Sequence, residues 1–231
     1  MKKLLYLALI VLVNSLQAQS KDVSLVKDIQ RANQVFPNGG FWVSNSAKDE
    51  IEGTPYLFNT WDNLSTLYTE DAVYSLNSFN YNIQLERFEA KFSEDSILII
   101  NTGNIKKIII NNIELKPYYD NEYRKIIFFE EIAKVDKVVL LKKNLVRVQK
   151  GSLNPMTQKK IKPDSYIVEE EFYVKNMDEV DLKPIKLKKS EILKLIKSDY
   201  QTKIILYAKE HGLKYYKLSD VHKILQYYNS L

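Results

Sequence analysis

Apolar and polar residues alternate through much of the chain between residues 41 and 174, which is the pattern of half-buried β-strands. The apolar runs are short, and turn-forming clusters such as Asp62-Asn63 separate them. After Pro184 the period of the apolar residues changes from about 2 to about 3.6, which predicts two or three amphipathic helices. These patterns predict an α+β fold: a mostly antiparallel β-sandwich, or a partly open β-barrel or meander, with a C-terminal helical tail packed on it.

The same patterns divide the chain into four segments. We expect a signal peptide over residues 1–18, a helical or irregular segment over 19–40, an antiparallel β domain over 41–184 and the helical tail over 185–231. Because isolated short helices are marginal in water, the apolar stripes of the tail need a partner. The nearest partner is the β domain.

The first residues have the composition of a secretory signal peptide. Lys2 and Lys3 precede an uninterrupted apolar run from Leu4 to Val13, and small and polar residues follow up to Ala18. The run is shorter than the roughly 20 apolar residues that a membrane-spanning helix needs, and no later segment reaches that length. We therefore expect cleavage near Ala18 and an exported chain without a transmembrane span, in the periplasm or outside the cell.

The composition excludes several kinds of chemistry. The chain contains no cysteine, which excludes disulfides, thiolate metal sites, a cysteine nucleophile and a lipid anchor on an N-terminal cysteine. The net charge of +5 falls to about +3 when Lys2 and Lys3 leave with the signal peptide. So small a basic excess argues for an unknown protein or envelope component as partner and against nucleic acid. No glycine-rich phosphate-binding loop is present, and no cofactor is expected.

The stretch FNYNIQLERFEAKF, residues 79–92, changes the phase of its apolar residues at Glu86 and Arg87. A shift of one residue turns every side chain of a strand to the other face, so the strand must contain an extra residue or end there. A β-bulge and a tight connection between two strands both fit. Because neither residue has glycine or asparagine beside it, we expect the bulge. A bulge that aims Glu86 or Arg87 into a cleft makes both residues candidates for ligand binding.

The stretch YIVEEEFYV, residues 166–174, suggests a carboxylate on the inner face of a strand. Alternation places Glu170 on the same face as Val168 and Phe172, so we expect its side chain to point inward. An inward charge protects an edge strand from aggregation, and it is also what a glycosidase carboxylate requires. His211 and His222 lie in the tail without the spacing of a metal site, and no serine lies in a nucleophile elbow. No catalytic residue or metal ligand is therefore assigned.

Aromatic residues are abundant, with 16 Tyr, 9 Phe and 2 Trp. The first predicted strands contain four that either fill the core or form a platform for sugar rings or a flat partner: Trp42, Tyr56, Trp61 and Tyr68. Together with Glu86, Arg87 and Glu170 they are the candidate ligand-binding residues. The segment KPIKLKKSEILKLIKS, residues 183–198, is basic and amphipathic, so it either docks on the sheet or makes a weak contact with an anionic membrane surface.

Three segments together resemble a group of uncharacterised secreted proteins, with a domain of unknown function, from Gram-negative envelope bacteria. They are GTPYLFNTW (53–61), NYNIQLERFEAKF (80–92) and DVHKILQYYNSL (220–231), and the residues that match the middle pattern are Tyr81, Asn82, Glu86 and Glu89. The resemblance implies no activity and no catalytic residue. The sequence thus predicts an exported binding or structural module that is not an enzyme. The alternative is a carbohydrate-binding or carbohydrate-cleaving protein that uses the early aromatics with an inward glutamate.

Overall fold

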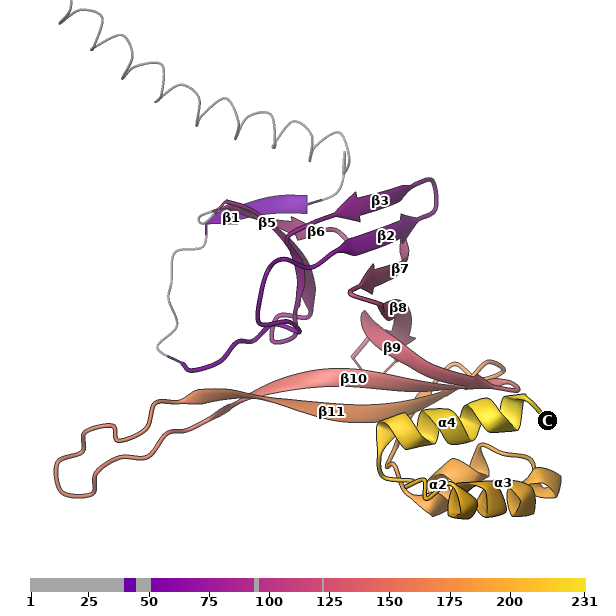
Figure 1. Cartoon of the computed structure of the whole chain (residues 1–231). Coiled ribbons are helices and arrows are strands. Elements are labelled where there is room, and N and C mark those ends of the chain that lie inside the picture. Colours follow the sequence, from indigo (N-terminus) through magenta and orange to yellow (C-terminus); the bar gives the residue numbers. More distant parts are fainter. Residues whose placement is uncertain (1–39, 45–50, 94–95, 122) are drawn as a thin grey trace, which may run out of the picture.

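The computed structural model describes residues 40–44, 51–93, 96–121 and 123–231, so the expected signal peptide and most of segment 19–40 lie outside the described residues. The described residues form two antiparallel sheets followed by three helices (Figure 1). The prediction of a mostly antiparallel β fold with a helical C-terminus is confirmed.

The smaller sheet has the strand order β1-β6-β5-β4. Its strands are β1 (Gly40–Ser44), β4 (Phe79–Asn82), β5 (Arg87–Ser93) and β6 (Ser96–Ile100). β4 and β5 form a hairpin in which Tyr81 is paired with Phe88. The phase change in the sequence therefore falls between two strands of one hairpin.

The larger sheet has the order β12-β11-β10-β9-β8-β7-β2-β3, in which β7 to β12 form a meander and the β2–β3 hairpin adds to its β7 edge. Its strands are β2 (Ser65–Thr69), β3 (Val73–Leu76), β7 (Ile105–Ile110), β8 (Ile113–Asp120), β9 (Lys125–Val135), β10 (Val138–Gln149), β11 (Ser165–Asn176) and β12 (Leu182–Ile185). β3 and β12 are its two ends and do not pair with each other, so the sheet does not close into a barrel.

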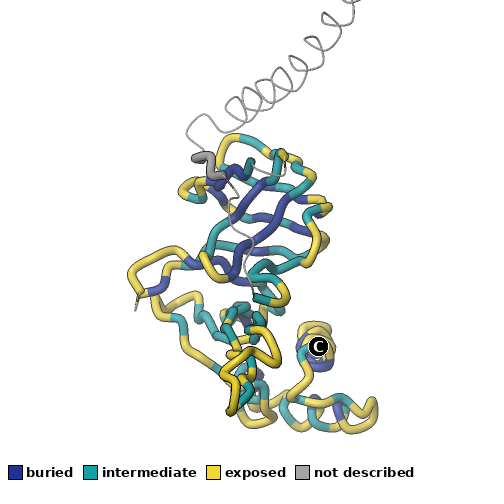
Figure 2. The backbone as a smooth tube through the Cα atoms, turned by 90° about the vertical axis from the view of Figure 1, so that its left-hand side faces the viewer, coloured by how far each residue is buried: buried dark blue, intermediate teal, exposed yellow. Residues whose placement is uncertain are grey.

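Apolar side chains from both sheets meet in one core. The smaller sheet contributes Phe79 and Phe88, and the larger sheet contributes Leu67 and Ile108; all four are fully buried. The ring of Phe88 lies edge-on to the ring of Phe128 on β9, with 4.8 Å between centroids. The buried strands of this core form the dark blue centre of Figure 2. The core is therefore built from strands that are distant along the chain.

β9 and β10 separate after a short paired stretch. They pair from Val138 to Lys142, whereas β10 stays paired with β11 as far as Gln149. Beyond Lys142 the two strands β10 and β11 therefore leave the sheet as a two-stranded arm, which projects from the rest of the molecule (Figure 1). Residues 150–164 form the tip of this arm.

The helices α2 (Lys189–Lys194), α3 (Ser198–Glu210) and α4 (Leu218–Asn229) pack on the larger sheet. Their buried side chains, among them Ile192 and Leu225, share one cluster with Val135 of β9 and Leu140 of β10. Ile192 and Ile196 of the basic segment 183–198 are both buried in this cluster, whereas its lysines are exposed. The segment therefore docks its apolar side chains on the sheet, and these side chains are not available to a membrane surface.

Candidate functional site

The β4–β5 connection occupies the position where the sequence changes phase. β4 ends at Asn82 and β5 begins at Arg87, so residues 83–86 form a four-residue turn. The prediction of a bulge at Glu86-Arg87 is wrong, because the strand ends there. The turn needs a residue with positive φ, and Glu86 itself adopts a φ of 49° without help from glycine or asparagine.

The side chain of Glu86 lies where β9 and β10 separate. Its Oε1 accepts a hydrogen bond of 2.7 Å from Nζ of Lys143 on β10, and its Oε2 accepts one from Nζ of Lys125 on β9. Burial acts to raise the pKa of Glu86, but the hydrogen bonds from Lys125 and Lys143 outweigh it and lower the pKa below its ordinary value. Glu86 therefore links the β4–β5 hairpin of the smaller sheet to both β9 and β10 of the larger sheet.

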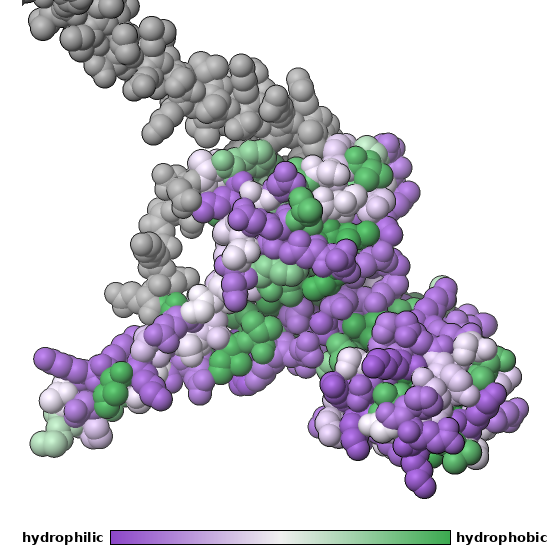
Figure 3. Space-filling view, viewed as in Figure 1, coloured by the Kyte–Doolittle hydropathy of each residue, from purple (hydrophilic) through white to green (hydrophobic). Residues whose placement is uncertain are grey.

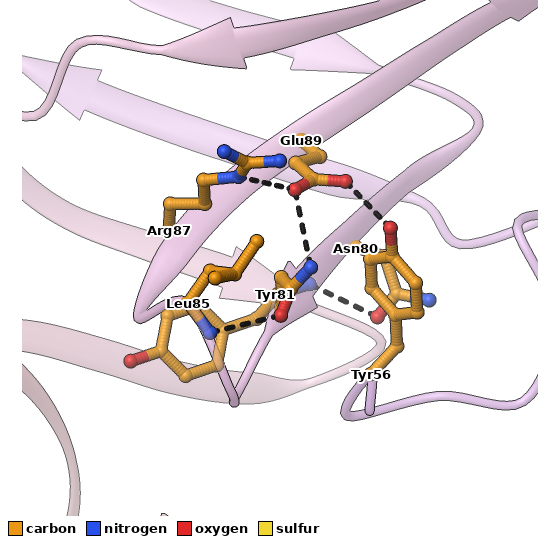
Figure 4. A network of polar contacts seen from close by, with 7 residues as sticks. Tyr56, Asn80, Tyr81, Leu85, Arg87 and Glu89 are labelled. Carbon is orange, nitrogen blue, oxygen red and sulfur yellow. Dashed lines mark hydrogen bonds and ion pairs between the residues drawn. The ribbon is translucent and has the colours of Figure 1, made fainter. Parts of the chain in front are cut away.

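A carboxylate that sequence analysis did not select as a site residue lies at the centre of a buried polar network (Figure 4). Glu89 on β5 is fully buried, and its Oε2 accepts a hydrogen bond of 2.7 Å from the hydroxyl of Tyr56. Its Oε1 accepts hydrogen bonds from Nδ2 of Asn82 at 3.2 Å and from Nε of Arg87 at 2.5 Å. Burial, and then the hydrogen bond to Glu89, raise the pKa of Tyr56 well above 10.0. The hydroxyl of Tyr56 is therefore a permanent donor.

The segment 53–61 covers Glu89 because it runs along the free edge of β4. The N–H of Leu57 donates to the carbonyl of Tyr81 at 2.9 Å, and the N–H of Ile83 donates to the carbonyl of Pro55 at 2.9 Å. The amide of Asn80 extends this connection, since its Nδ2 donates to the carbonyl of Phe58 at 2.9 Å. Segment 53–61 is thus held to the small sheet by backbone and side-chain hydrogen bonds together.

Asn63 makes a similar connection between the two sheets. Its Nδ2 donates to the carbonyls of Thr60 at 2.7 Å and of Phe79 at 2.9 Å, and its Oδ1 accepts from Nδ2 of Asn111 at 2.6 Å. Buried polar groups are costly unless they are hydrogen-bonded, and in this region they are bonded to one another. The hydrogen bonds of Glu89 and of these asparagines therefore hold the loops around β4 in place.

Three of the four candidate aromatics have described side chains, and these make two separate sets of ring contacts. Tyr56 and Trp61 are neighbours, with 5.0 Å between ring centroids and an angle of 62° between their planes. Tyr68 on β2 lies apart from this pair under Nζ of Lys107, at 4.7 Å from its ring centroid. Trp42 belongs to β1, whose side chains are outside the described part of the chain. The Tyr56–Trp61 pair is edge-to-face, whereas a stacking platform for a sugar ring needs an open ring face.

Glu170 is exposed, so the prediction of an inward carboxylate is wrong. Glu170 pairs with Asn144 of β10, beyond the last β9–β10 pair at Lys142, and at this position alternation along β11 does not report burial. The nearest cation is Nζ of Lys142, at 3.5 Å from Oε1. Glu170 also lines an open groove of about 500 Å³ with Tyr173, Pro184 and Ile185.

The two histidines are in separate surroundings. A ring nitrogen of His211 lies 3.0 Å from the carbonyl oxygen of Tyr207 at the end of α3. His222 on α4 is exposed and lines a second hollow, about 340 Å³ in volume, with Glu130 and Glu131 of β9. Among the described residues no group of three or more His, Asp or Glu side chains is placed to hold a metal ion.

The sequence of β5 does not show the network, because Glu89 alternates with the apolar residues Phe88 and Ala90 and nothing in this strand indicates that its side of β5 is covered. That side is covered by a loop whose position depends on long-range hydrogen bonds. A local signal was present: Asn80 and Asn82 occupy two of the four positions of β4, although asparagine is depleted in strands. Two asparagines in so short a strand indicate that their side-chain amides form hydrogen bonds with a neighbouring segment.

Comparisons with family models, with curated proteins and with solved structures gave no match for this chain. Within the described residues, none of the helices has both the length and the apolar character that are required to cross a membrane.

Proposed function

We propose that the protein is an exported binding or structural module of the bacterial envelope that does not act as an enzyme. The observation that carries this proposal is that Glu86 and Glu89 are each held by hydrogen bonds and ion pairs from neighbouring side chains. Glu89 receives three side-chain donors and has no exposed surface, and Glu86 is held between Lys125 and Lys143. A general acid or base must reach its substrate and exchange a proton with it, which these two carboxylates are not placed to do.

The proposal includes export, which the residues of segment 1–18 support. It also includes a periplasmic or extracellular location and the resemblance to secreted proteins of unknown function. The proposal also includes the packing of the two sheets as a β-sandwich. The core that Phe79 and Phe88 share with Leu67 and Ile108 supports this arrangement. A rigid body of this kind suits a protein that presents loops or an arm to a partner.

The test of export is a mass-spectrometric determination of the mature N-terminus in cells that make the native protein. We expect a chain that begins near Gln19 and fractionates outside the cytoplasm. A full-length chain retained in the cytoplasm would contradict the proposal.

A carbohydrate-binding or carbohydrate-cleaving role is the second candidate, and two observations favour it. The half-buried Tyr56–Trp61 pair presents part of its surface to solvent, and Glu170 lines the groove beside Tyr173. A glycan array separates the two roles. Specific binding that is lost in Trp42→Ala and Trp61→Ala, with an unchanged circular dichroism spectrum, would favour the carbohydrate role; no specific binding is what the first proposal predicts.

A further inference from the structure

The tip of the β10–β11 arm is an ordered loop. The N–H of Asn154 donates to the carbonyl of Lys159 at 2.8 Å, and the N–H of Gln158 donates to the carbonyl of Asn154 at 2.8 Å. The side chain of Asn154 also accepts a hydrogen bond of 2.9 Å from the N–H of Met156. These bonds close a tight turn at the apex, so the backbone of the tip has a defined course.

The base of the tip is also closed. The N–H of Gly151 donates to Oδ1 of Asp164 at 2.9 Å across the arm. A Cβ atom at position 151 would lie 1.9 Å from the carbonyl oxygen of Lys162, so only glycine fits there. The two sides of the arm are therefore in contact at residue 151, and the apex projects beyond this contact.

The tip exposes three large apolar side chains. The exposed fraction is 93% for Met156, 62% for Ile161 and 49% for Leu153. Figure 3 shows green atoms among purple ones at the end of the arm. None of the three side chains belongs to a core cluster of the described residues, so burial within the chain does not explain their apolar character.

The same tip is basic. Residues 150–164 contain four lysines and one acidic residue, Asp164, which gives a net charge of 4 − 1 = +3. Asp164 lies 3.1 Å from Nζ of Lys150 and 3.8 Å from Nζ of Lys160. Among the described residues no carboxylate lies within ion-pair distance of Lys159 or Lys162, which are both exposed. The charge of the tip is therefore available to an anionic partner.

We propose that the arm tip docks on an anionic phospholipid surface, with Met156, Leu153 and Ile161 in the interface and the lysines on the headgroups. Apolar side chains combined with a basic patch give reversible binding to such a surface. The tip is narrow and convex, and a fluid interface accepts a convex apex without a complementary groove. The lysine stems reach along the apolar side chains while their charges stay with the phosphates. This inference rests on the proposed export and names the envelope component involved.

The experiment uses the full mature chain and vesicles of phosphatidylcholine with or without phosphatidylglycerol. Co-sedimentation should show binding to the anionic vesicles, weaker binding at higher salt, and little binding to phosphatidylcholine alone. Each lysine near an anionic surface contributes roughly fivefold to partitioning, so Lys159→Ala with Lys162→Ala should lower it by roughly 25-fold. Met156→Asp should reduce binding further by removing the apolar apex.

Matched controls are available on the helices. Lys203→Ala with Lys223→Ala removes the same charge from exposed positions of α3 and α4, and Leu206→Asp alters an exposed apolar residue of α3. Both controls should bind as the unmodified chain does. Because the chain has no cysteine, Met156→Cys can carry a polarity-sensitive dye as the only thiol label. Its emission should shift to the blue on anionic vesicles, whereas a dye on Leu206→Cys should not respond.

Three results would overturn the docking proposal. The first is equal loss of binding in the tip and control variants, and the second is an unchanged dye at position 156. The third is binding to polyglutamate without binding to vesicles, which would assign the tip to an acidic polypeptide. If the mature N-terminus is near Gln19, any of these three results would contradict the lipid contact and leave the proposed export unaffected. An uncleaved chain retained in the cytoplasm would instead contradict the proposed function.

Discussion

The hydroxyl of Tyr228, in the last helix, donates a hydrogen bond of 2.6 Å to Oδ2 of Asp136, which lies in the turn between β9 and β10. Oδ1 of Asp136 accepts a second one, of 3.1 Å, from Nζ of Lys197 just before α3. These bonds join the tail to the sheet at the surface, above the shared apolar cluster that contains Val135 and Leu225. The tail and the larger sheet should therefore unfold together.

Leu225→Ala tests this coupling. Leu225 is fully buried, and truncation of such a leucine lowers the free energy of unfolding by about 2–5 kcal/mol. We expect the whole chain to melt at a lower temperature in a single transition in a calorimetric scan. Leu206→Ala on the exposed side of α3 is the control and should change the free energy by less than about 0.5 kcal/mol.

Deletion of the residues after Ser219 extends the test to the whole last helix. Because α4 supplies Val221, Ile224 and Leu225 to the shared cluster, its loss should lower the melting temperature of the β-sheets as well. A truncated chain with an unaltered midpoint would mean that the tail is a detached arm.

Gly151→Ala tests the rigidity of the β10–β11 arm. The added Cβ would meet backbone atoms of Lys162 and Pro163, so the two sides of the arm must separate there. We expect faster amide hydrogen exchange over residues 150–164 with little change in global stability, since residues 150–164 belong to none of the core clusters. Gly103→Ala is the control, because a Cβ there would meet only the side chain of Asn101. Slowed or unchanged exchange in Gly151→Ala would contradict the closed base of the arm.

The Glu86 ion pairs predict a pH dependence of stability. The folded-state pKa of Glu86 is below its ordinary 4.5, so its contribution is complete above about pH 4.5 and is lost as the pH falls through the folded pKa. Glu86→Gln should therefore lower the free energy of unfolding near neutral pH, and the difference from the unmodified chain should shrink in acid. Urea titrations at several pH values measure it. Glu70→Gln, at an exposed position, should show no such trend, and a constant difference for Glu86→Gln would contradict the ion pairs.

The fold was more predictable than the site. Alternation and the change of period at Pro184 depend on which face of an element is buried, and strands such as β2 and the tail follow them, whereas all four residues of β4 are buried. The predictions were wrong where contacts with residues distant in the sequence determine the burial or the backbone conformation of a residue. Glu170 lies on a regular strand, but at a position beyond the end of the β9–β10 pairing, where its side chain is exposed. Glu86 adopts a positive φ in a turn, although neither Glu86 nor the residues beside it are glycine or asparagine.

Glu89 shows why the site was harder to predict. The sequence places it on the polar side of β5 with Arg87, and only the path of segment 53–61 along the edge of β4 buries it. That path depends on Tyr56 and on the amides of Asn80 and Asn82, which act over long sequence separations. The Tyr56–Trp61 contact was likewise unpredictable in its edge-to-face geometry, although both residues were recognised as candidates.

Our account assigns Glu89 a structural role: it holds segment 53–61 on the smaller sheet and is not a reactive group. A double-mutant cycle on the free energy of unfolding tests this role most directly. The cycle combines Tyr56→Phe, Glu89→Gln and both together, with Tyr216→Phe and Glu70→Gln as a control pair at exposed positions. A hydrogen bond to a buried charge predicts a coupling energy of about 1–3 kcal/mol for Tyr56 and Glu89, and none for the control pair. Additive effects of Tyr56→Phe and Glu89→Gln would contradict the structural role of Glu89.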